Sequence, residues 1–151
     1  MVGVRFWSVR HARALRRLYD ACARVSRLLA PLVRLAGRGR AEALLQPVER
    51  VSKGLLFDCK MCGDCALSKT GMSCPMNCPK TLRNGPCGGV RPNGHCEVKP
   101  EMRCVWVAAW DGASRMKGGE AIKQVNFALD HRLRGTSSWL KLAREDHDAA
   151  A

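Results

Sequence analysis

The stretch that decides the fold is FDCKMCGDCALSKTGMSCPMNCPK, residues 57–80, which holds five of the nine cysteines in this 151-residue chain. Three of these cysteines follow one another at steps of three, and the other two are each followed by proline. Residues 59–104 hold eight cysteines with the spacing C-x2-C-x2-C-x8-C-x3-C-x8-C-x8-C-x7-C. They are Cys59, Cys62, Cys65, Cys74, Cys78, Cys87, Cys96 and Cys104.

Apart from its cysteines, this segment offers few large apolar side chains from which to build a core. Ordering a residue costs about 1.5 kcal/mol, and so small an apolar inventory does not offset that cost. A structural metal supplies on the order of 10 kcal/mol or more. We therefore expect the eight cysteines to be metal ligands that hold the segment together, in two sets of four.

The metal bound by these cysteines is interpreted in two main ways. Four thiolates suit either a tetrahedral zinc ion or one cubane iron–sulfur cluster. A C-x2-C-x2-C triplet with Cys-Pro pairs further along is typical of ferredoxins, although three-sulfur runs also occur in zinc sites. Four disulfides are a third reading, but they need an oxidising compartment that nothing in the sequence indicates. His95 is interpreted as a turn residue rather than as a ligand.

Residues 1–54 predict basic amphipathic helices, because apolar residues recur there at helical steps: Leu15, Leu18, Cys22, Val25, Leu29 and Leu32. Pro31 should end or kink this helix near Ala30. A second helical pattern follows, limited by Pro47 and capped by Gly54: Leu44, Leu45, Val48, Val51 and Leu55. Cys22 lies on the first apolar stripe, so we interpret it as a packing residue rather than as a ligand.

Charge narrows the classes of partner. The net charge is +13, and residues 1–54 carry 12 Lys and Arg against three acidic residues. This favours an acidic protein, a membrane surface or nucleic acid. Aromatic residues make up only 5% of the chain, and no nucleic-acid motif is present, so nucleic acid is not the expected partner. No apolar run approaches the roughly 18 residues that span a bilayer, and we expect a cytoplasmic protein without a transmembrane segment.

The remaining elements complete a fold class of α-helices plus irregular structure. Asn93-Gly94, between Val90 and Val98, predicts the tight turn of a short β-hairpin in the cysteine-rich module. Residues 105–117 predict a C-terminal helix that ends at a glycine pair. In LRNGPCGG, Arg83 and Asn84 are expected to serve the surroundings of the metal site rather than to be ligands. They belong either to a simple turn in which Gly85 supplies a positive φ, or to a surface on which Arg83 meets an acidic patch of a partner.

The expected organisation has three parts: a basic helical docking region (1–54), a cysteine-rich metal or iron–sulfur module with the helix that follows it (55–117), and a basic tail (118–151).

The string LFDCKMCGDCALSKTGMSCPMNCPKTLRNGPCGGVRPNGHCEVKPEMRCVW, residues 56–106, resembles a known family. It is similar to the cysteine-rich domain at the C-terminus of some bacterial methylenetetrahydrofolate reductases, which also occurs as a separate small subunit beside the reductase. The motifs CPMNCPK, RNGPCGG, and CEVKP followed by CVW carry the resemblance, over about residues 55–110.

The resemblance implies an accessory electron-transfer subunit. Such a subunit would hold two [4Fe-4S] clusters, or alternatively zinc, on the eight cysteines. It would pass electrons from a ferredoxin-like donor to the flavin of a partner barrel subunit, which reduces methylenetetrahydrofolate. A barrel of that kind needs roughly 200 residues or more, so we do not expect this chain to be catalytic alone. The alternatives are a zinc-binding structural or docking subunit of the same reductase, and a basic zinc protein that binds nucleic acid.

Overall fold

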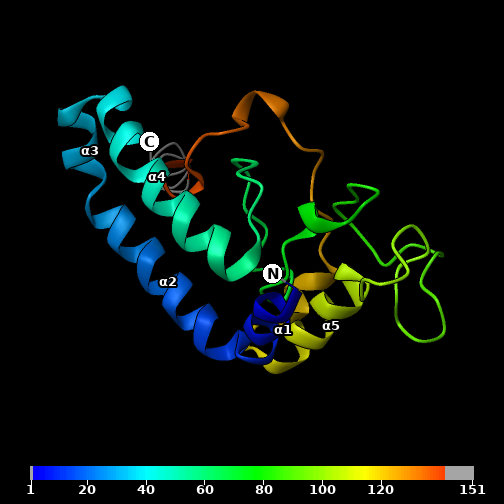
Figure 1. Ribbon diagram of the computed structural model, residues 1–151. Coiled ribbons are helices and arrows are strands. Elements are labelled where there is room, and N and C mark those ends of the chain that lie inside the picture. The colour runs from blue at the N-terminus through cyan, green and yellow to red at the C-terminus, as the bar shows by residue number, and fades with distance from the viewer. Residues whose placement is uncertain (1, 142–151) are drawn as a thin grey trace.

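The computed structural model describes residues 2–141, and this part of the chain is mostly helical (Figure 1). Four helices precede the cysteine-rich segment: α1 (Val2–Arg10), α2 (Ala12–Leu28), α3 (Ala30–Ala36) and α4 (Arg38–Phe57). A fifth helix follows that segment, α5 (Val105–Arg115). Three short 3-10 helices and a further helical turn that begins at residue 138 complete the regular structure: η1 (Pro75–Asn77), η2 (Gly119–Lys123) and η3 (His131–Leu133).

Helices α2 and α3 run in one direction and α4 returns beside them, so the three form a helical hairpin (Figure 1). Gly37 makes the turn with a φ of +82°, a conformation that glycine adopts without steric cost. Helices α1 and α5 pack across the end of the hairpin where α4 finishes. Among the described residues, no helix is both long enough and apolar enough to cross a membrane.

The expected break near Ala30 is confirmed, because α2 ends at Leu28 and α3 begins at Ala30. The expected limits of the second helix are wrong, since α4 runs through both Pro47 and Gly54 and ends only at Phe57. After Pro47, α4 buries three side chains, and this packing offsets the cost of a proline and a glycine inside a helix: Glu49, Lys53 and Phe57.

The face of α2 that packs against the protein differs from the apolar stripe seen in the sequence. The buried residues of α2 are Ala12, Leu15, Tyr19 and Ala23. From the stripe, only Leu15 is buried and Cys22 is half-buried, whereas Leu18, Val25, Leu29 and Leu32 are exposed. The helix therefore carries two apolar faces, of which the chain itself covers one.

The buried faces of α2 and α4 share one core with the cysteine-rich segment. This cluster joins side chains from four separate stretches of the chain: Ala12, Leu15, Tyr19, Phe57, Leu67, Met72, Cys74 and Met116. The helical hairpin is thus packed directly on the segment that carries the thiols.

The predicted β-hairpin is wrong, because no strand forms within residues 2–141. The turn itself lies where it was expected, with the Gly94 N–H donating to the Arg91 carbonyl at 2.8 Å. Only isolated antiparallel bridges flank it, between Val90 and Cys96 and between His95 and Arg103.

A third segment, residues 102–104, bonds to the other side of residues 94–96. The Cys96 N–H donates to the Met102 carbonyl, and the Cys104 N–H donates to the Gly94 carbonyl, both at 2.9 Å. The Arg91 N–H still donates to the His95 carbonyl at 2.9 Å and the Glu97 N–H to the Gly89 carbonyl at 3.1 Å, so residues 102–104 add to this turn and replace none of its bonds.

The expected C-terminal helix is confirmed as α5, which carries a buried Trp106 and an exposed Trp110. The indole Nε1 of Trp106 donates to the Leu82 carbonyl at 3.3 Å. Helix α5 also approaches the cysteine-rich segment closely, since a Cβ added at Gly71 would lie 2.2 Å from the Ala109 carbonyl oxygen.

Candidate metal centre

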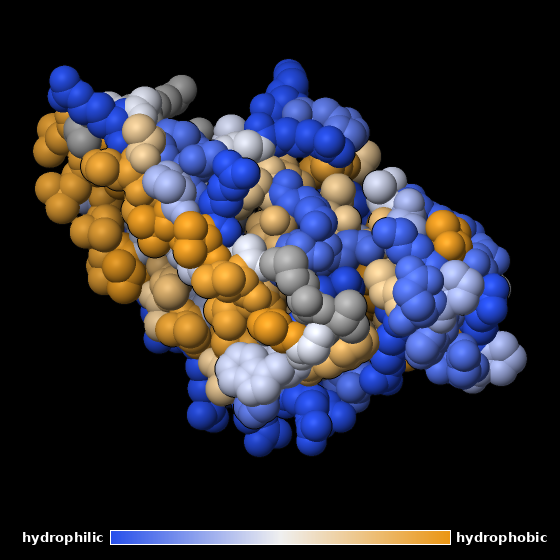
Figure 2. Space-filling model, in the orientation of Figure 1, coloured by the Kyte–Doolittle hydropathy of each residue, from blue (hydrophilic) through white to orange (hydrophobic). Residues whose placement is uncertain are grey.

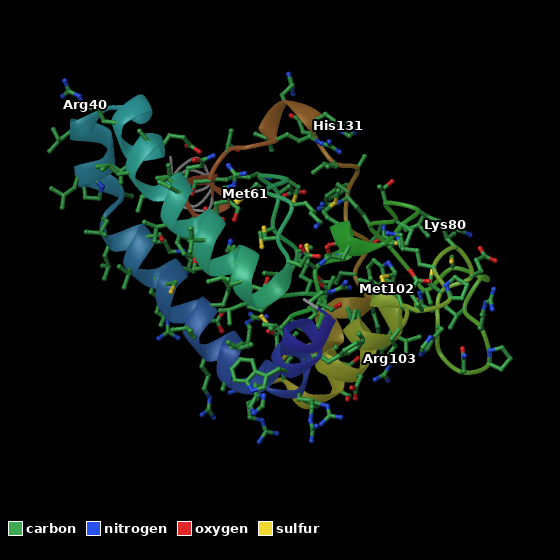
Figure 3. All side chains as sticks on the ribbon, in the orientation of Figure 1. Arg40, Met61, Lys80, Met102, Arg103 and His131 are labelled. Atoms are coloured by element: carbon green, nitrogen blue, oxygen red, sulfur yellow. The ribbon has the colours of Figure 1, made fainter. Side chains whose placement is uncertain are left out.

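Four of the eight predicted ligands line one cavity between α4, the loop that follows it and the start of η1: Cys59, Cys62, Cys65 and Cys74. The first three come from the loop, which curls tightly at Met61 and Gly63, both with positive φ. The fourth returns to the loop after a turn whose apolar residues, Leu67 and Met72, are anchored in the core. Figure 3 shows this loop, marked by Met61, alongside α4.

Hydrogen-bond donors surround these sulfurs. The Met61 backbone N–H donates to Cys59 Sγ at 3.4 Å, and the Met76 N–H donates to Cys74. The Tyr19 hydroxyl of α2 is hydrogen-bonded to Cys65, and burial raises the pKa of Tyr19 above its usual value. Donors of this kind stabilise the charge of a thiolate.

Burial raises the pKa of the Cys59 thiol to about 11 and that of Cys74 to about 12. The neighbouring thiols add to both shifts, because one negative sulfur disfavours another beside it. Without a cation these thiols stay protonated, whereas a bound metal would hold them as thiolates. All nine cysteines of the chain are free thiols.

A buried ion pair on α4 lies beside the same cavity. Lys53 Nζ lies 2.6 Å from Glu49 Oε1, and Glu49 lines the cavity. Burial opposes both charges, but the attraction between opposite charges outweighs it. Lys53 lowers the pKa of Glu49, whereas the negative charges of a Cys65 thiolate and of Glu49 raise the pKa of Lys53.

Serines near the C-terminus form hydrogen bonds with both members of this ion pair. Ser138 Oγ accepts a hydrogen bond from Lys53 Nζ at 2.7 Å and donates to Glu49 Oε1 at 2.5 Å. Ser137 Oγ donates to the other oxygen of Glu49 at 2.5 Å. The Lys53 ammonium also lies 4.9 Å from the centre of the Trp139 ring and 5.3 Å from that of Tyr19. No free charge is therefore left buried at the wall of the cavity.

Residues 133–141 act as a cover over the cysteine loop, and we call this segment the cover. The Gly135 N–H donates to the Met61 carbonyl at 2.8 Å, and Gln46 donates to the Gly135 carbonyl at 3.1 Å. A Cβ added at Gly63 would lie 2.2 Å from the Leu133 carbonyl oxygen, so glycine permits this close approach.

Asp64, between two of the cavity cysteines, is held by two cations. Arg83 Nη2 lies 2.6 Å from one carboxylate oxygen and Lys141 Nζ lies 2.8 Å from the other. Arg83 thus lies beside the site through a contact within the chain, and its contact with an acidic patch on a partner stays a prediction. Gly85, expected to supply a positive φ in a simple turn, does not adopt one.

The other four predicted ligands, Cys78, Cys87, Cys96 and Cys104, do not line this cavity. They lie in the stretch from the end of η1 to the start of α5, which includes Lys80 (Figure 3). The Glu97 carboxylate raises the pKa of Lys80, and the nearby thiols of Cys87 and Cys96 add to that effect. Within residues 2–141, no three His, Cys, Asp or Glu side chains are arranged so that they could hold a metal ion.

Sequence reasoning missed Glu49, Lys53 and the serines of the cover. The only signal was a Glu and a Lys four residues apart on a helix, a pattern that is usually a solvent-exposed pair. Cys22, interpreted as a packing residue, is half-buried on α2 and does not line the cavity.

The fold and the site together define a class of protein: it is small and mostly helical, and it gathers four cysteine thiols in one cavity. Residues 39–132 match the family of methylene-tetrahydrofolate reductase C-terminal domains, and because this is more than half of the chain, the chain belongs to that family. The match contains all eight predicted ligands and ends where the cover begins. Neither a curated protein nor a solved structure matches the chain.

Proposed function

We propose that this chain is an accessory electron-transfer subunit of a methylenetetrahydrofolate reductase, with iron–sulfur clusters held by its cysteines. The observation that carries the proposal is the gathering of Cys59, Cys62, Cys65 and Cys74 in one cavity, within a chain of the reductase's C-terminal family. The remaining four cysteines form the second proposed ligand set: Cys78, Cys87, Cys96 and Cys104.

The donor chemistry of the first set suits a cluster, although no three side chains in residues 2–141 converge as they would on a single metal ion. Four cysteines are the donor set that a cubane cluster requires, and three of the sulfurs here are hydrogen-bonded, by Met61, Met76 and Tyr19. A bound cluster would supply one-electron transfer, for which potential is tuned by hydrogen bonds to sulfur and by exclusion of water. In this chain Thr136 and Ser138 of the cover line the cavity, and α4 supplies the buried Glu49 to its wall.

The proposed partner is the flavin-containing barrel subunit of the reductase, and the proposed electron donor is a ferredoxin-like protein. Reduction of the folate is proposed to take place on that barrel subunit. Its part is to hold the redox group, keep water away from it and dock on the catalytic subunit.

The test is to purify the full chain without oxygen and to measure its absorption spectrum, iron, acid-labile sulfide and zinc. Broad absorption near roughly 400 nm, with iron and sulfide in equal amounts, is the expected result. Cys74→Ser should lose iron, while the control Cys22→Ser should keep the full amount. A colourless protein with stoichiometric zinc would overturn the electron-transfer role and favour a zinc-binding docking subunit of the same reductase.

A further inference from the structure

The helical hairpin carries a second apolar face that the described chain leaves exposed. Its eight side chains are each between 43% and 72% exposed: Leu18, Val25, Leu29, Leu32, Leu44, Val48, Val51 and Leu55. Figure 2 shows apolar surface running continuously along the hairpin on the side that faces the viewer. We call this surface the hairpin face.

The hairpin face is built from two stripes that lie far apart in the sequence. On α4 the steps between its residues are four, three and four, which place them on one side of the helix. The hairpin turn at Gly37 brings this stripe beside that of α2 and α3. Single exposed apolar residues are ordinary, but contiguous patches larger than a few hundred Å² mark interaction sites.

Positive charge borders the hairpin face. Arg17, Arg24 and Arg50 are exposed, and each comes one position before a residue of the face. The three acidic residues of these helices do not offset that charge, because each is engaged within the chain. Asp20 pairs with Arg16 at 2.9 Å, Glu49 pairs with Lys53 at 2.6 Å, and Glu42 accepts from the Ser137 N–H.

We infer that the hairpin face binds a folded protein whose surface has an apolar centre rimmed by Asp and Glu. Resting on the proposed function, that protein is the catalytic subunit of the reductase. Charge complementarity selects this occupant, because two copies of the chain meeting through the hairpin face would bring their arginines together.

The inferred interface also places one set of cysteines nearer to the partner than the other. The hairpin that presents the face buries Tyr19 and Phe57 in the same core as Cys74. An α-helix with its side chains is about 10–12 Å across, so the bound protein lies roughly one helix away from the first set. Lys80, which is close to the thiols of Cys87 and Cys96, lies on the side of that set away from the hairpin (Figure 3). The first set is therefore the one next to the partner.

The test is to express the full chain with the catalytic subunit and to measure their affinity for one another. Leu18→Asp with Val25→Asp on α2, and Val48→Asp with Val51→Asp on α4, should each weaken binding by at least about 30-fold. The matched control is Val98→Asp with Val125→Asp, two exposed apolar residues outside the hairpin face, which should leave affinity unchanged. Metal content and helical circular dichroism should stay the same in all three variants.

Salt gives a second readout, since affinity should fall as sodium chloride rises and screens the arginines. Wild-type affinity for the catalytic subunit in both helix variants would overturn the inferred face and leave the proposed function standing. Failure of the wild-type chain to bind that subunit would instead overturn the proposed partner. Two further results would overturn the inferred occupant: a homodimer that the helix variants disrupt, and flotation with anionic phosphatidylserine vesicles that the same variants abolish.

Discussion

Lys53 shows how much of this site depends on a single buried charge. Its side chain is 3% exposed, and its ammonium is held by Glu49 and Ser138 and lies over two aromatic rings. A buried ion pair is costly to break, because the remaining partner keeps its charge without compensation. The pair therefore fixes the cover to α4 as well as closing the wall of the cavity.

Lys53→Met should lower the free energy of unfolding by about 3–5 kcal/mol, since it leaves the Glu49 carboxylate buried and unpaired. Urea unfolding of the full chain measures this loss. The double variant Lys53→Met with Glu49→Leu removes both charges and should recover most of the stability. A double variant no more stable than the single one would show that the ion pair is not what the cover depends on.

At the scale of single residues, the sequence identifies the cysteines as candidate ligands but does not predict the residues that surround them. Residues of one chemical kind at short spacing are visible in a sequence, and so the thiols were identifiable. Glu49 and Lys53 look like a solvent-exposed helical pair, because what buries them is Ser137 and Ser138, contributed by a segment more than 80 residues away. Nothing local to α4 indicates that contact.

At the scale of elements, periodicity predicts the helices but not which of their faces is buried. The apolar stripe of α2 is real, yet the chain packs the neighbouring face that carries Tyr19 and two alanines. Small residues on this face of α2 allow the cysteine-rich segment to pack close to the helix. A pattern of hydrophobicity along the sequence does not indicate that close packing. Likewise Pro47 ends no helix, because packing further along α4 outweighs its local cost.

The cover meets the cysteine loop at a glycine, and this contact can be tested. Gly63→Ala should destabilise the protein by about 1–3 kcal/mol more than Gly135→Ala does. Both glycines have positive φ, so both changes carry the same backbone strain, but only at Gly63 would the added Cβ collide with the cover.

Hydrogen exchange at residues 133–141 is the measurement, together with urea unfolding of both variants. The expected result is faster exchange throughout the cover in Gly63→Ala and little change in Gly135→Ala. Equal exchange in the two variants would mean that the cover does not rest on the loop.

At the scale of the whole molecule, the largest core cluster is apolar and joins α2 and α4 to the cysteine-rich segment, with Cys74 as its buried thiol. The sequence predicts that this segment needs support beyond its own apolar residues, because it has too few large ones to fold unaided. It does not predict how eight cysteines divide into sets, since that division depends on how the chain returns after each loop.

Cys62→Ser should unfold the cysteine-rich segment, not merely inactivate it. If metal supplies the ordering energy, an incomplete ligand set loses most of it, and residues 57–104 become sensitive to protease. Limited proteolysis followed by mass spectrometry locates the cuts. Cys22→Ser is the matched control and should remain resistant. Metal-depleted Cys62→Ser protein as resistant as wild type would contradict a metal-dependent fold.

The cover has a consequence for where this protein can be shortened. The family match stops at residue 132, one residue before the cover begins. A chain trimmed at that boundary would keep every predicted ligand while removing Ser137 and Ser138 from the buried ion pair. The thiols would then meet dissolved oxygen and begin the oxidation ladder from thiolate to sulfenic acid and beyond. We therefore expect the cysteines of a fragment that ends at residue 132 to oxidise faster in air than those of the full chain.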